Sequence, residues 1–185
     1  MSLRIIAGTW RQRRIEAPPG RSTRPLPDRI KQSLFDWLGQ RCDGWRVIDC
    51  CAGSGSFGFE AASRGAVAVD LIEHDPAACA LLERNRAGLP GASERCRIHR
   101  ADACAILPGL GTCDLVFADP PFPWYATQRE RLEQLIAAAA AALGEDGRLL
   151  LRGERGQDSP SPPTGLRETE RRSYGRSWVS LLRRA

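Results

Sequence analysis

Short apolar runs alternate with segments of helical spacing over most of the chain. The apolar runs are expected to be strands at residues 46–50, 67–72, 97–100, 114–118 and 148–152. The helical spacing predicts helices at residues 57–63, 76–85 and 130–143. Strands that alternate with helices of this length predict an α/β fold, with a mainly parallel sheet and helices on both of its faces.

The two ends of the chain carry further elements. Residues 3–8 and 11–15 predict a hairpin around Gly8 and Thr9, and residues 167–173 and 177–182 predict a second hairpin over Gly175. Between the N-terminal hairpin and the first strand, residues 18–27 are rich in Pro, Gly, Ser and Thr and predict a loop. We therefore expect a hairpin extension at residues 1–20 and one α/β domain at residues 21–185.

A helix is expected to follow the loop. Asp28 is placed to cap a helix that runs to about Leu38. The residues expected on its apolar face are Ile30, Leu34, Trp37 and Leu38.

Composition excludes several classes of protein. Hydrophobic residues make up 42% and charged residues 26%, which is typical of globular proteins. No apolar run reaches the roughly 18 residues of a membrane span, and the N-terminus lacks the apolar core of a signal peptide, so we expect a cytoplasmic protein. The cysteines have no C-x-x-C spacing, which predicts free, mostly buried thiols and no zinc site. They are Cys42, Cys50, Cys51, Cys79, Cys96, Cys104 and Cys113.

The net charge of +5 is unevenly distributed. Residues 1–48 carry ten Lys and Arg against four Asp and Glu, and residues 165–185 carry six against two. Residues 49–164 carry eleven against sixteen. Basic ends beside an acidic middle indicate a polyanion held by the ends of the chain. An arginine-rich coding bias is the alternative, but it would not remove the excess of basic over acidic residues from the middle of the chain.

A glycine-rich loop follows the first strand of the predicted sheet. Gly53, Gly55 and Gly58 match G-x-G-x-x-G, which brings the backbone close to a ligand and turns it into a helix. Glu73 ends the second strand, where a carboxylate can accept hydrogen bonds from ribose hydroxyls. Both features fit NAD and S-adenosylmethionine sites. Asp49, four residues before Gly53, and Asp102, placed to meet an adenine amine, favour S-adenosylmethionine.

The most specific motif is Asp119-Pro120-Pro121-Phe122, at the end of the fourth strand. Two successive prolines give a rigid loop with few free donors. The Asp119 carboxylate and the Pro120 carbonyl can each accept one N–H of an exocyclic base amine, whose lone pair then faces the methyl group. Phe122 offers a flat surface on which the base, taken out of its stack, can rest.

These motifs together resemble the bacterial family that methylates N2 of guanine 966 in 16S ribosomal RNA. The resemblance covers almost the whole chain. Two N-terminal motifs narrow the family: Arg4-Ile5-Ile6-Ala7-Gly8-x-Trp10-Arg11, and Arg24-Pro25 with Asp28-Arg29 and Leu34-Phe35-x-Trp37-Leu38. The others recur in many amino-methyltransferases: Asp49-Cys50-x-Ala52-Gly53-Ser54-Gly55, Leu71-Ile72-Glu73-x-Asp75 and the Asp119 motif.

The resemblance implies a Rossmann-like methyltransferase fold with seven strands, S-adenosylmethionine as cofactor and 16S ribosomal RNA in the small subunit or its assembly intermediate as substrate. It also implies that residues 23–29 close over the cofactor, and we expect a monomer. The expected catalytic residues are Asp119, Pro120, Pro121 and Phe122. The expected cofactor contacts are Thr23, Arg24, Arg29, Asp49, Ala52, Gly53, Ser54, Gly55, Glu73, His74, Asp102, Ala103 and Asp119.

Phosphates and bases of the RNA are expected to meet the basic N-terminal segment. Its candidate residues are Arg4, Trp10, Arg11, Arg13, Arg14 and Arg21. Arginines there would fix the register of the RNA without reading its sequence. Trp10 could stack on a base or simply staple the hairpin.

At four positions the chain departs from the family pattern. The family has threonines at the places of Leu26 and Pro27, a glutamate at Gln32 and a phenylalanine at Cys51. Family contacts from the first three side chains are therefore not carried over, and Cys51 changes the packing near the glycine loop.

Four other functions compete with this one. A DNA adenine or cytosine amino-methyltransferase usually has a target-recognition domain, for which few residues remain after Phe122. A protein glutamine methyltransferase uses Asn before Pro-Pro. An NAD oxidoreductase leaves the Asp119 motif unexplained. A non-catalytic RNA-binding assembly factor would be expected to lose the glycines, Glu73 or Asp119, and all are present.

Overall fold

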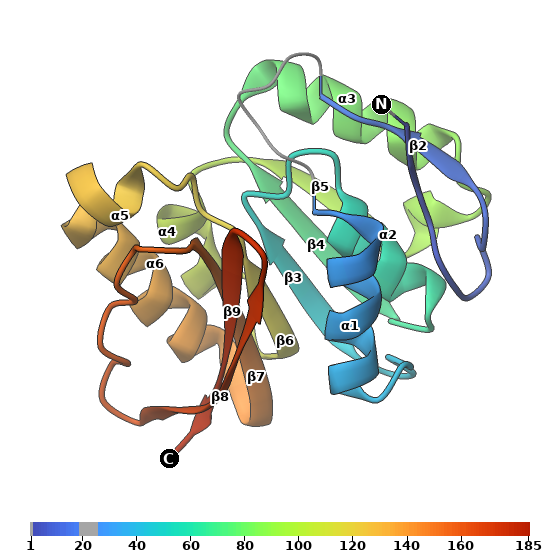
Figure 1. The fold of residues 1–185 in the computed structure, drawn as a ribbon. Helices are drawn as coiled ribbons and strands as arrows, with labels where there is room; N and C mark the ends of the chain where they lie inside the picture. The colour runs from blue at the N-terminus through green and yellow to red at the C-terminus, as the bar shows by residue number, and fades with distance from the viewer. Residues whose placement is uncertain (1, 19–25) are drawn as a thin grey trace. The chain divides into compact units, whose positions relative to one another are not determined.

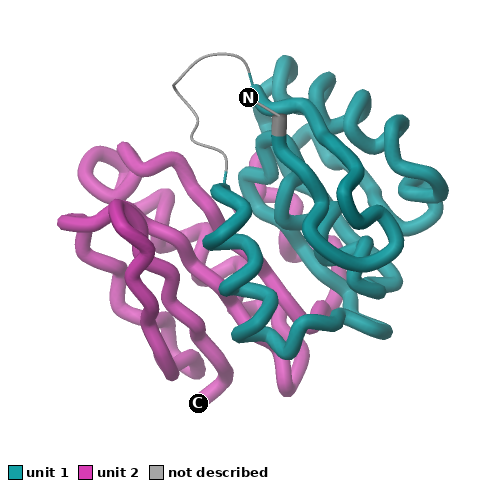
Figure 2. Tube along the Cα trace, turned by 45° about the vertical axis from the view of Figure 1, so that its right-hand side comes forward, with its two compact units in different colours: residues 1–101 teal, residues 102–185 magenta. Residues whose placement is uncertain are grey.

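The computed structural model describes residues 2–18 and 26–185. The chain forms two compact units, Met1–Ala101 and Asp102–Ala185 (Figure 2). The predictions for Arg21, Thr23 and Arg24 lie outside the described residues. The proposed division into residues 1–20 and 21–185 stays a prediction.

Unit 1 holds three parallel strands of the main sheet. They are β3 (Arg46–Cys50), β4 (Ala68–Glu73) and β5 (Cys96–Arg100), and β4 pairs with both of the others (Figure 1). The helices are α1 (Asp28–Leu38), α2 (Ser56–Ser63) and α3 (Pro76–Ala87), with a short 3-10 turn at Ala92–Glu94. Strand β4 is buried from Val69 onward on both of its faces, as expected of a strand inside a parallel sheet.

The predicted N-terminal hairpin is confirmed, with shorter strands than expected. Strand β1 (Ser2–Arg4) pairs antiparallel with β2 (Arg14–Glu16), and Leu3 lies opposite Ile15. Both of these apolar side chains are buried.

The predicted helix α1 is also confirmed, but two of its details were wrong. Pro27 occupies the N-cap position and no side chain caps the helix, so Asp28 is its first residue. The buried face includes Lys31 and Phe35, whereas Trp37 is only half-buried. Phe35 stacks on Phe57 of α2 with ring centroids 4.9 Å apart, which explains why the buried face is shifted.

Unit 2 supplies four strands. They are β6 (Cys113–Ala118), β7 (Leu143–Glu154), β8 (Leu166–Tyr174) and β9 (Ser177–Arg184). Strands β6 and β7 are parallel, and β9 pairs antiparallel with both β7 and β8. The C-terminal hairpin predicted over Gly175 is thus confirmed. The long helix is α6 (Arg129–Ala142); the short helices α4 (Ala103–Ile106) and α5 (Trp124–Thr127) and a 3-10 turn at Leu107–Gly109 were not predicted.

The main sheet has seven strands and is mostly parallel, as expected. The seven cysteines all lie among the described residues, and none of them forms a disulfide. Among the described residues, no helix is both long enough and apolar enough to cross a membrane.

Candidate active site

The glycine loop after β3 is bound to the end of β4. The N–H of Gly53 donates to Oε2 of Glu73 at 3.0 Å. Oε1 of Glu73 accepts the N–H groups of His74 at 2.9 Å and Asp75 at 3.0 Å. These three donors compensate for burying the charge of a carboxylate that is only 8% exposed. Gly53 and Glu73, which the sequence assigns to the same ligand, therefore lie side by side in unit 1.

The three glycines of the motif do different work. A Cβ on Gly58 would lie 2.5 Å from Cδ2 of Leu71, so this glycine allows α2 to pack on β4. A Cβ on Gly55 would clash with Phe59, and Gly55 also has a left-handed φ of 75°. A Cβ on Gly53 would have no atom within 4 Å. Open space at Gly53, beside the Glu73 carboxylate, fits a cofactor that approaches the backbone closely.

We expect Gly58→Ala and Gly53→Ala to fail in different ways. Gly58→Ala should lower the free energy of unfolding by about 1–3 kcal/mol, because the new methyl overpacks the contact with Leu71. Gly53→Ala should cost only about 1–2 kcal/mol, for its φ of 54°, but should weaken cofactor binding. Thermal unfolding and calorimetry with S-adenosylmethionine measure the two effects. Equal loss of cofactor affinity in both variants would argue against the assignment of Gly53.

Other predicted cofactor residues of unit 1 have varied surroundings. Asp49 is 2% exposed, and its Oδ2 accepts the N–H of Gly58 at 2.9 Å, so it supports the first turn of α2. Ser54 is buried, and its carbonyl accepts from Asn85 at 3.0 Å. The His74 side chain is 64% exposed. Ala52 is buried at the loop, and Arg29 is exposed on α1. Their contacts with a cofactor stay predictions.

Unit 2 presents the Asp119 motif where β6 ends. The carbonyls of Pro121, Phe122 and Pro123 accept N–H groups from the residues of α5. The carbonyl of Phe122 also accepts Nε2 of Gln157 at 2.8 Å. In the described part of the chain, no hydrogen bond reaches the carbonyl of Pro120. Of the four carbonyls in residues 120–123, only that of Pro120 therefore keeps its full accepting capacity, as the predicted chemistry requires.

One partner of the motif was not predicted. Arg152 of β7 donates from Nη1 to Oδ2 of Asp119 at 2.7 Å, and its guanidinium carbon lies 5.2 Å from the centre of the Phe122 ring. Burial raises the pKa of Asp119, and the charge and hydrogen bond of Arg152 oppose that rise. The sequence offered one signal: an arginine directly after the three leucines of a buried strand.

Asp102 begins unit 2, and its carboxylate is already engaged. Oδ1 accepts the N–H of Cys104 at 2.8 Å and so caps α4, while Oδ2 pairs with Arg131. Burial would raise the pKa of Asp102, but Arg131 and the Cys104 N–H lower it overall. An adenine amine would have to share this carboxylate with Arg131. Ala103, the next predicted residue, is buried.

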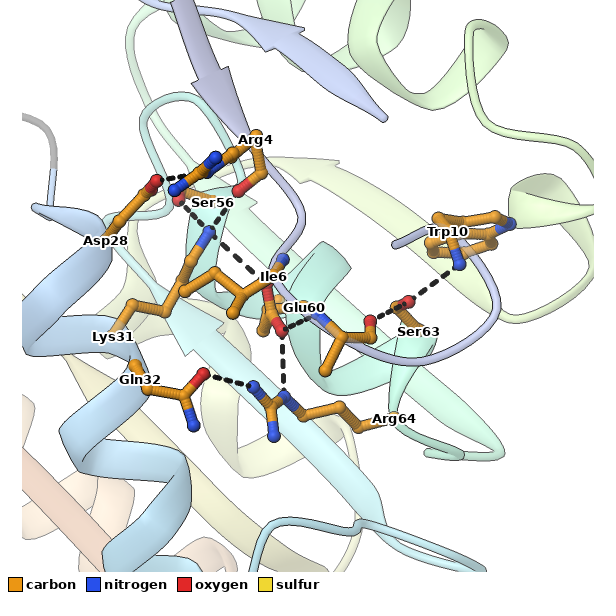
Figure 3. A network of polar contacts seen from close by, with 12 residues as sticks. Arg4, Ile6, Trp10, Asp28, Lys31, Gln32, Ser56, Glu60, Ser63 and Arg64 are labelled. Atoms are coloured by element: carbon orange, nitrogen blue, oxygen red, sulfur yellow. Dashed lines mark hydrogen bonds and ion pairs between the residues drawn. The ribbon is translucent and has the colours of Figure 1, made fainter. Parts of the chain in front are cut away.

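Within unit 1, a buried ion network attaches the N-terminal hairpin to helices α1 and α2 (Figure 3). Glu60 of α2 accepts the backbone N–H groups of Ile6 at 2.7 Å and Ala7 at 3.0 Å. The same carboxylate pairs with Lys31 at 3.3 Å and Arg64 at 2.8 Å. The side chains of Lys31 and Glu60 are fully buried. Lys31 also donates to the carbonyl of Arg4 at 2.8 Å, so one ion cluster joins the hairpin, α1 and α2.

Trp10 is part of this attachment, which corrects its proposed role in RNA stacking. Its side chain is buried, with the residue 3% exposed, and its indole N–H donates to the carbonyl of Pro90 at 2.9 Å. Its backbone N–H donates to Oγ of Ser63 at 2.9 Å (Figure 3). A ring held in this way staples the hairpin and has no free face for a base.

The arginines of the hairpin remain exposed. Arg11, Arg13 and Arg14 are exposed, and Arg4 pairs with Asp28 at 2.7 Å with 55% of its side chain accessible. Arg4 and Arg14 face each other in the β1–β2 register and line one hollow together with Gln12 and Asp28. The hairpin thus presents positive charge on a surface that its buried apolar residues hold in place.

The departures from the family pattern are accommodated locally. Leu26 is buried, and the carbonyl of Pro27 accepts the N–H groups of Ile30 and Lys31. Gln32 accepts from Arg64 at 3.3 Å and donates to Asp36 at 2.6 Å. Cys51 is half-buried in a left-handed conformation, with φ 61°.

Comparison with known proteins identifies the family of the chain. The family model described as "Conserved hypothetical protein 95" matches residues 3–183. A ribosomal RNA small subunit methyltransferase D of Escherichia coli K12 is 40% identical over 135 residues, which are 72% of this chain and 65% of that protein. The chain therefore matches slightly less than two thirds of that relative. The putative rRNA methyltransferase YlbH of Bacillus subtilis is 29% identical over 98% of this chain and 99% of its own length.

Solved structures extend the likeness to the whole fold. The putative methyltransferase yhhF of Escherichia coli superposes with a TM-score of 0.84 at 30% identity, over 100% of this chain and 98% of its own. The putative methylase HI0767 of Haemophilus influenzae gives a TM-score of 0.78 at 28% identity, over 100% and 99%. The described residues hold no group of three or more side chains suited to a metal ion. Because the family model covers nearly the whole chain, the protein belongs to the family described as conserved hypothetical protein 95, and its expected kinship with bacterial methyltransferases of small-subunit ribosomal RNA is confirmed.

Proposed function

We propose that the protein transfers a methyl group from S-adenosylmethionine to the exocyclic N2 amine of a guanine in 16S ribosomal RNA. The observation that carries the proposal is the pair of acceptors at the end of β6. The Asp119 carboxylate and the Pro120 carbonyl are adjacent, and no hydrogen bond from the described residues occupies the carbonyl. An exocyclic amine has two N–H groups, so it needs two such acceptors.

The chain's own residues account for the chemistry on the amine. The nitrogen lone pair is delocalised into the base, so the amine is a weak nucleophile. Acceptors on both N–H groups turn the lone pair out toward the electrophile, and such positioning supplies much of the rate enhancement. As the nitrogen gains positive charge, the Asp119 carboxylate stabilises that charge at close range.

The cofactor proposal rests on unit 1. Gly53 has open space where a side chain would stand, and the Glu73 carboxylate lies against the same loop. Glu73 carries one hydrogen bond on Oε2, so this oxygen can accept another from a ribose hydroxyl. When bound, S-adenosylmethionine supplies a methyl group on a positively charged sulfur.

The proposed substrate rests on the relatives of the chain. The same acceptors would suit an adenine or cytosine amine, so the geometry alone supports the reaction type. Guanine N2, 16S ribosomal RNA and a cytoplasmic location come from the family resemblance and from relatives named as methyltransferases of small-subunit ribosomal RNA.

The test is methyl transfer from labelled S-adenosylmethionine to three substrates: unmodified small ribosomal subunits, naked 16S RNA and duplex DNA. Digestion to nucleosides and mass analysis should find N2-methylguanosine in RNA. Methyladenine or methylcytosine in DNA would keep the amine chemistry and overturn the substrate. Bound cofactor without transfer to any of the three would favour another substrate or a non-catalytic RNA-binding factor.

RNA binding is expected to depend on the hairpin. Replacing Arg11, Arg13 and Arg14 together by alanine should weaken RNA binding and reduce the slope of log K against log salt by up to about two to three, because each phosphate contact contributes about 0.7–0.9. Filter binding over a series of salt concentrations measures this slope. The matched control replaces three exposed arginines of unit 1 outside the hairpin, Arg41, Arg46 and Arg97. If the control changes the slope as much as the hairpin variant does, the hairpin is not the phosphate-binding surface.

A further inference from the structure

Arg152 is an arginine buried inside a strand. It follows Leu149, Leu150 and Leu151 in β7, and only 4% of its side chain is exposed. Burial of a guanidinium is costly unless its charge is paired and its N–H groups are bonded. An arginine at such a position therefore needs an explanation beyond packing.

The contacts of this guanidinium converge on the Asp119 motif. Nη1 donates to Oδ2 of Asp119 at 2.7 Å, and Nη2 donates to Oγ of Ser177 at 3.2 Å. The guanidinium carbon lies 5.2 Å from the Phe122 ring centre, within the range of a cation–π contact. One side chain thus touches both the first and the last residue of the motif.

One of the hydrogen-bond donors of the Arg152 guanidinium is left without a partner. Nε of Arg152 is buried and has no hydrogen-bond partner among the described residues. A buried donor left unpaired costs about 1–3 kcal/mol. A side chain whose only role is stability would not be expected to leave a buried donor unpaired, whereas side chains of functional sites often do.

Among the side chains around Arg152, Asp119 is the one expected to change its protonation state. Tyr125 of α5 donates its hydroxyl to the carbonyl of Arg152 at 2.7 Å. Burial, then the Asp119 charge, raise the pKa of Tyr125 far above its usual value, against Arg129, Arg152 and Arg171, so it stays neutral. Ser177 of β9 is uncharged. Asp119 itself is pulled in opposite directions, since burial raises its pKa and Arg152 lowers it.

We propose that Arg152 is a positioning residue for methyl transfer: it keeps Asp119 ionised, occupies Oδ2 so that Oδ1 is left for the substrate amine, and fixes the Phe122 ring. The inference rests on the proposed function. A protonated Asp119 would be a weaker acceptor for the hydrogen bonds from Arg152 and the amine. It would also carry no negative charge to stabilise positive charge on the nitrogen. Arg152 acts on the reaction only through Asp119 and Phe122.

The first measurement reads Asp119 directly, without substrate. Protein with 13C-labelled aspartate carboxyls is titrated by NMR, and Asp119→Asn assigns the signal. In Arg152→Met the Asp119 midpoint should rise by about one pH unit or more, because the burial remains and the opposing charge is gone. Arg148→Met, the same change on the same strand, should leave the midpoint within a few tenths of a unit. An unchanged midpoint in Arg152→Met would overturn the proposal.

The second measurement is the pH profile of kcat for RNA methylation. The acid limb of Arg152→Met should move up with the NMR midpoint, and kcat should fall more than the KM for RNA rises. A lower kcat with an unmoved acid limb would indicate a merely structural role. Arg152→Lys keeps the charge, so its midpoint should stay near that of the wild type, while kcat falls because an ammonium cannot hold Asp119 and Ser177 in the same geometry. If Arg152→Lys instead matches Arg152→Met in both readouts, the charge argument fails.

The two proposals fail separately. A wild type that methylates no RNA, together with the expected midpoint shift in Arg152→Met, contradicts the proposed function and supports the control of Asp119 by Arg152. A wild type that methylates RNA, together with an unshifted midpoint, contradicts the role of Arg152 alone.

Discussion

Asp119→Ala should lower kcat for RNA methylation by about 100-fold or more, while the Kd for S-adenosylmethionine changes by no more than a few-fold. Loss of one preorganised electrostatic contact with a transition state typically costs two to three orders of magnitude. The substitution removes both the acceptor of one amine N–H and the charge that stabilises the methylated nitrogen. Single-turnover kinetics and calorimetry with the cofactor measure the two effects separately.

The controls must account for Arg152, which loses its ion-pair partner in Asp119→Ala. A buried charge left without its partner typically costs about 3–5 kcal/mol, so assays belong well below the measured melting temperature. Asp119→Asn keeps an acceptor for Arg152 and should lose kcat with a smaller loss of stability. Asp114→Ala, at an exposed position on the same strand, should behave like the wild type. Cofactor affinity that falls as much as kcat would show that Asp119 serves the cofactor and not the amine.

A large loss of stability is expected for Glu60→Gln. The glutamine keeps the shape of the side chain but leaves Lys31 and Arg64 buried without their shared counter-ion. We expect a loss of about 3–5 kcal/mol in the free energy of unfolding, or about 10 °C in Tm. Burial already lowers the pKa of Lys31 and Glu60 opposes this, so Lys31 should lose its proton more readily in the variant.

The matched control is Glu83→Gln on α3. Glu83 also pairs with an arginine, Arg86 at 2.6 Å, but about half of its side chain is exposed. An exposed pair contributes at most about 1 kcal/mol. Urea unfolding of both variants gives the comparison, and Lys31→Met combined with Glu60→Gln should cost less than the sum of the two changes. Similar losses for Glu60→Gln and Glu83→Gln would mean that the ion network contributes little to the fold.

Features that depend on residues close together in the sequence could be predicted from the sequence alone. Glu73 ends β4, Asp119 directly follows β6, and Gly53 lies in the loop after β3, so these residues and their strands could be predicted from local sequence. The pairing of Arg152 with Asp119 could not, because the two are 33 positions apart. It depends on the register that sets Ala118 beside Leu151 in the β6–β7 pair.

Trp10 illustrates the same limit. An aromatic residue among arginines is compatible both with a base platform and with a buried staple. The choice depends on Pro90, 80 positions away, and on Ser63, 53 positions away. Lys31 was likewise absent from the predicted apolar face of its helix, and its burial depends on the carboxylate of Glu60 on α2.

The Glu60 cluster also constrains how this sequence can drift. Losing Glu60 leaves the charges of Lys31 and Arg64 without their shared counter-ion, whereas replacing a buried ion cluster as a set with apolar side chains is often tolerated. The effects of substitutions at these positions are therefore expected to be epistatic: loss of Glu60 is harmful alone and becomes tolerable when Lys31 and Arg64 are replaced with it. Among descendants of this chain, the three positions should covary, and with them the backbone course of the hairpin that Glu60 holds.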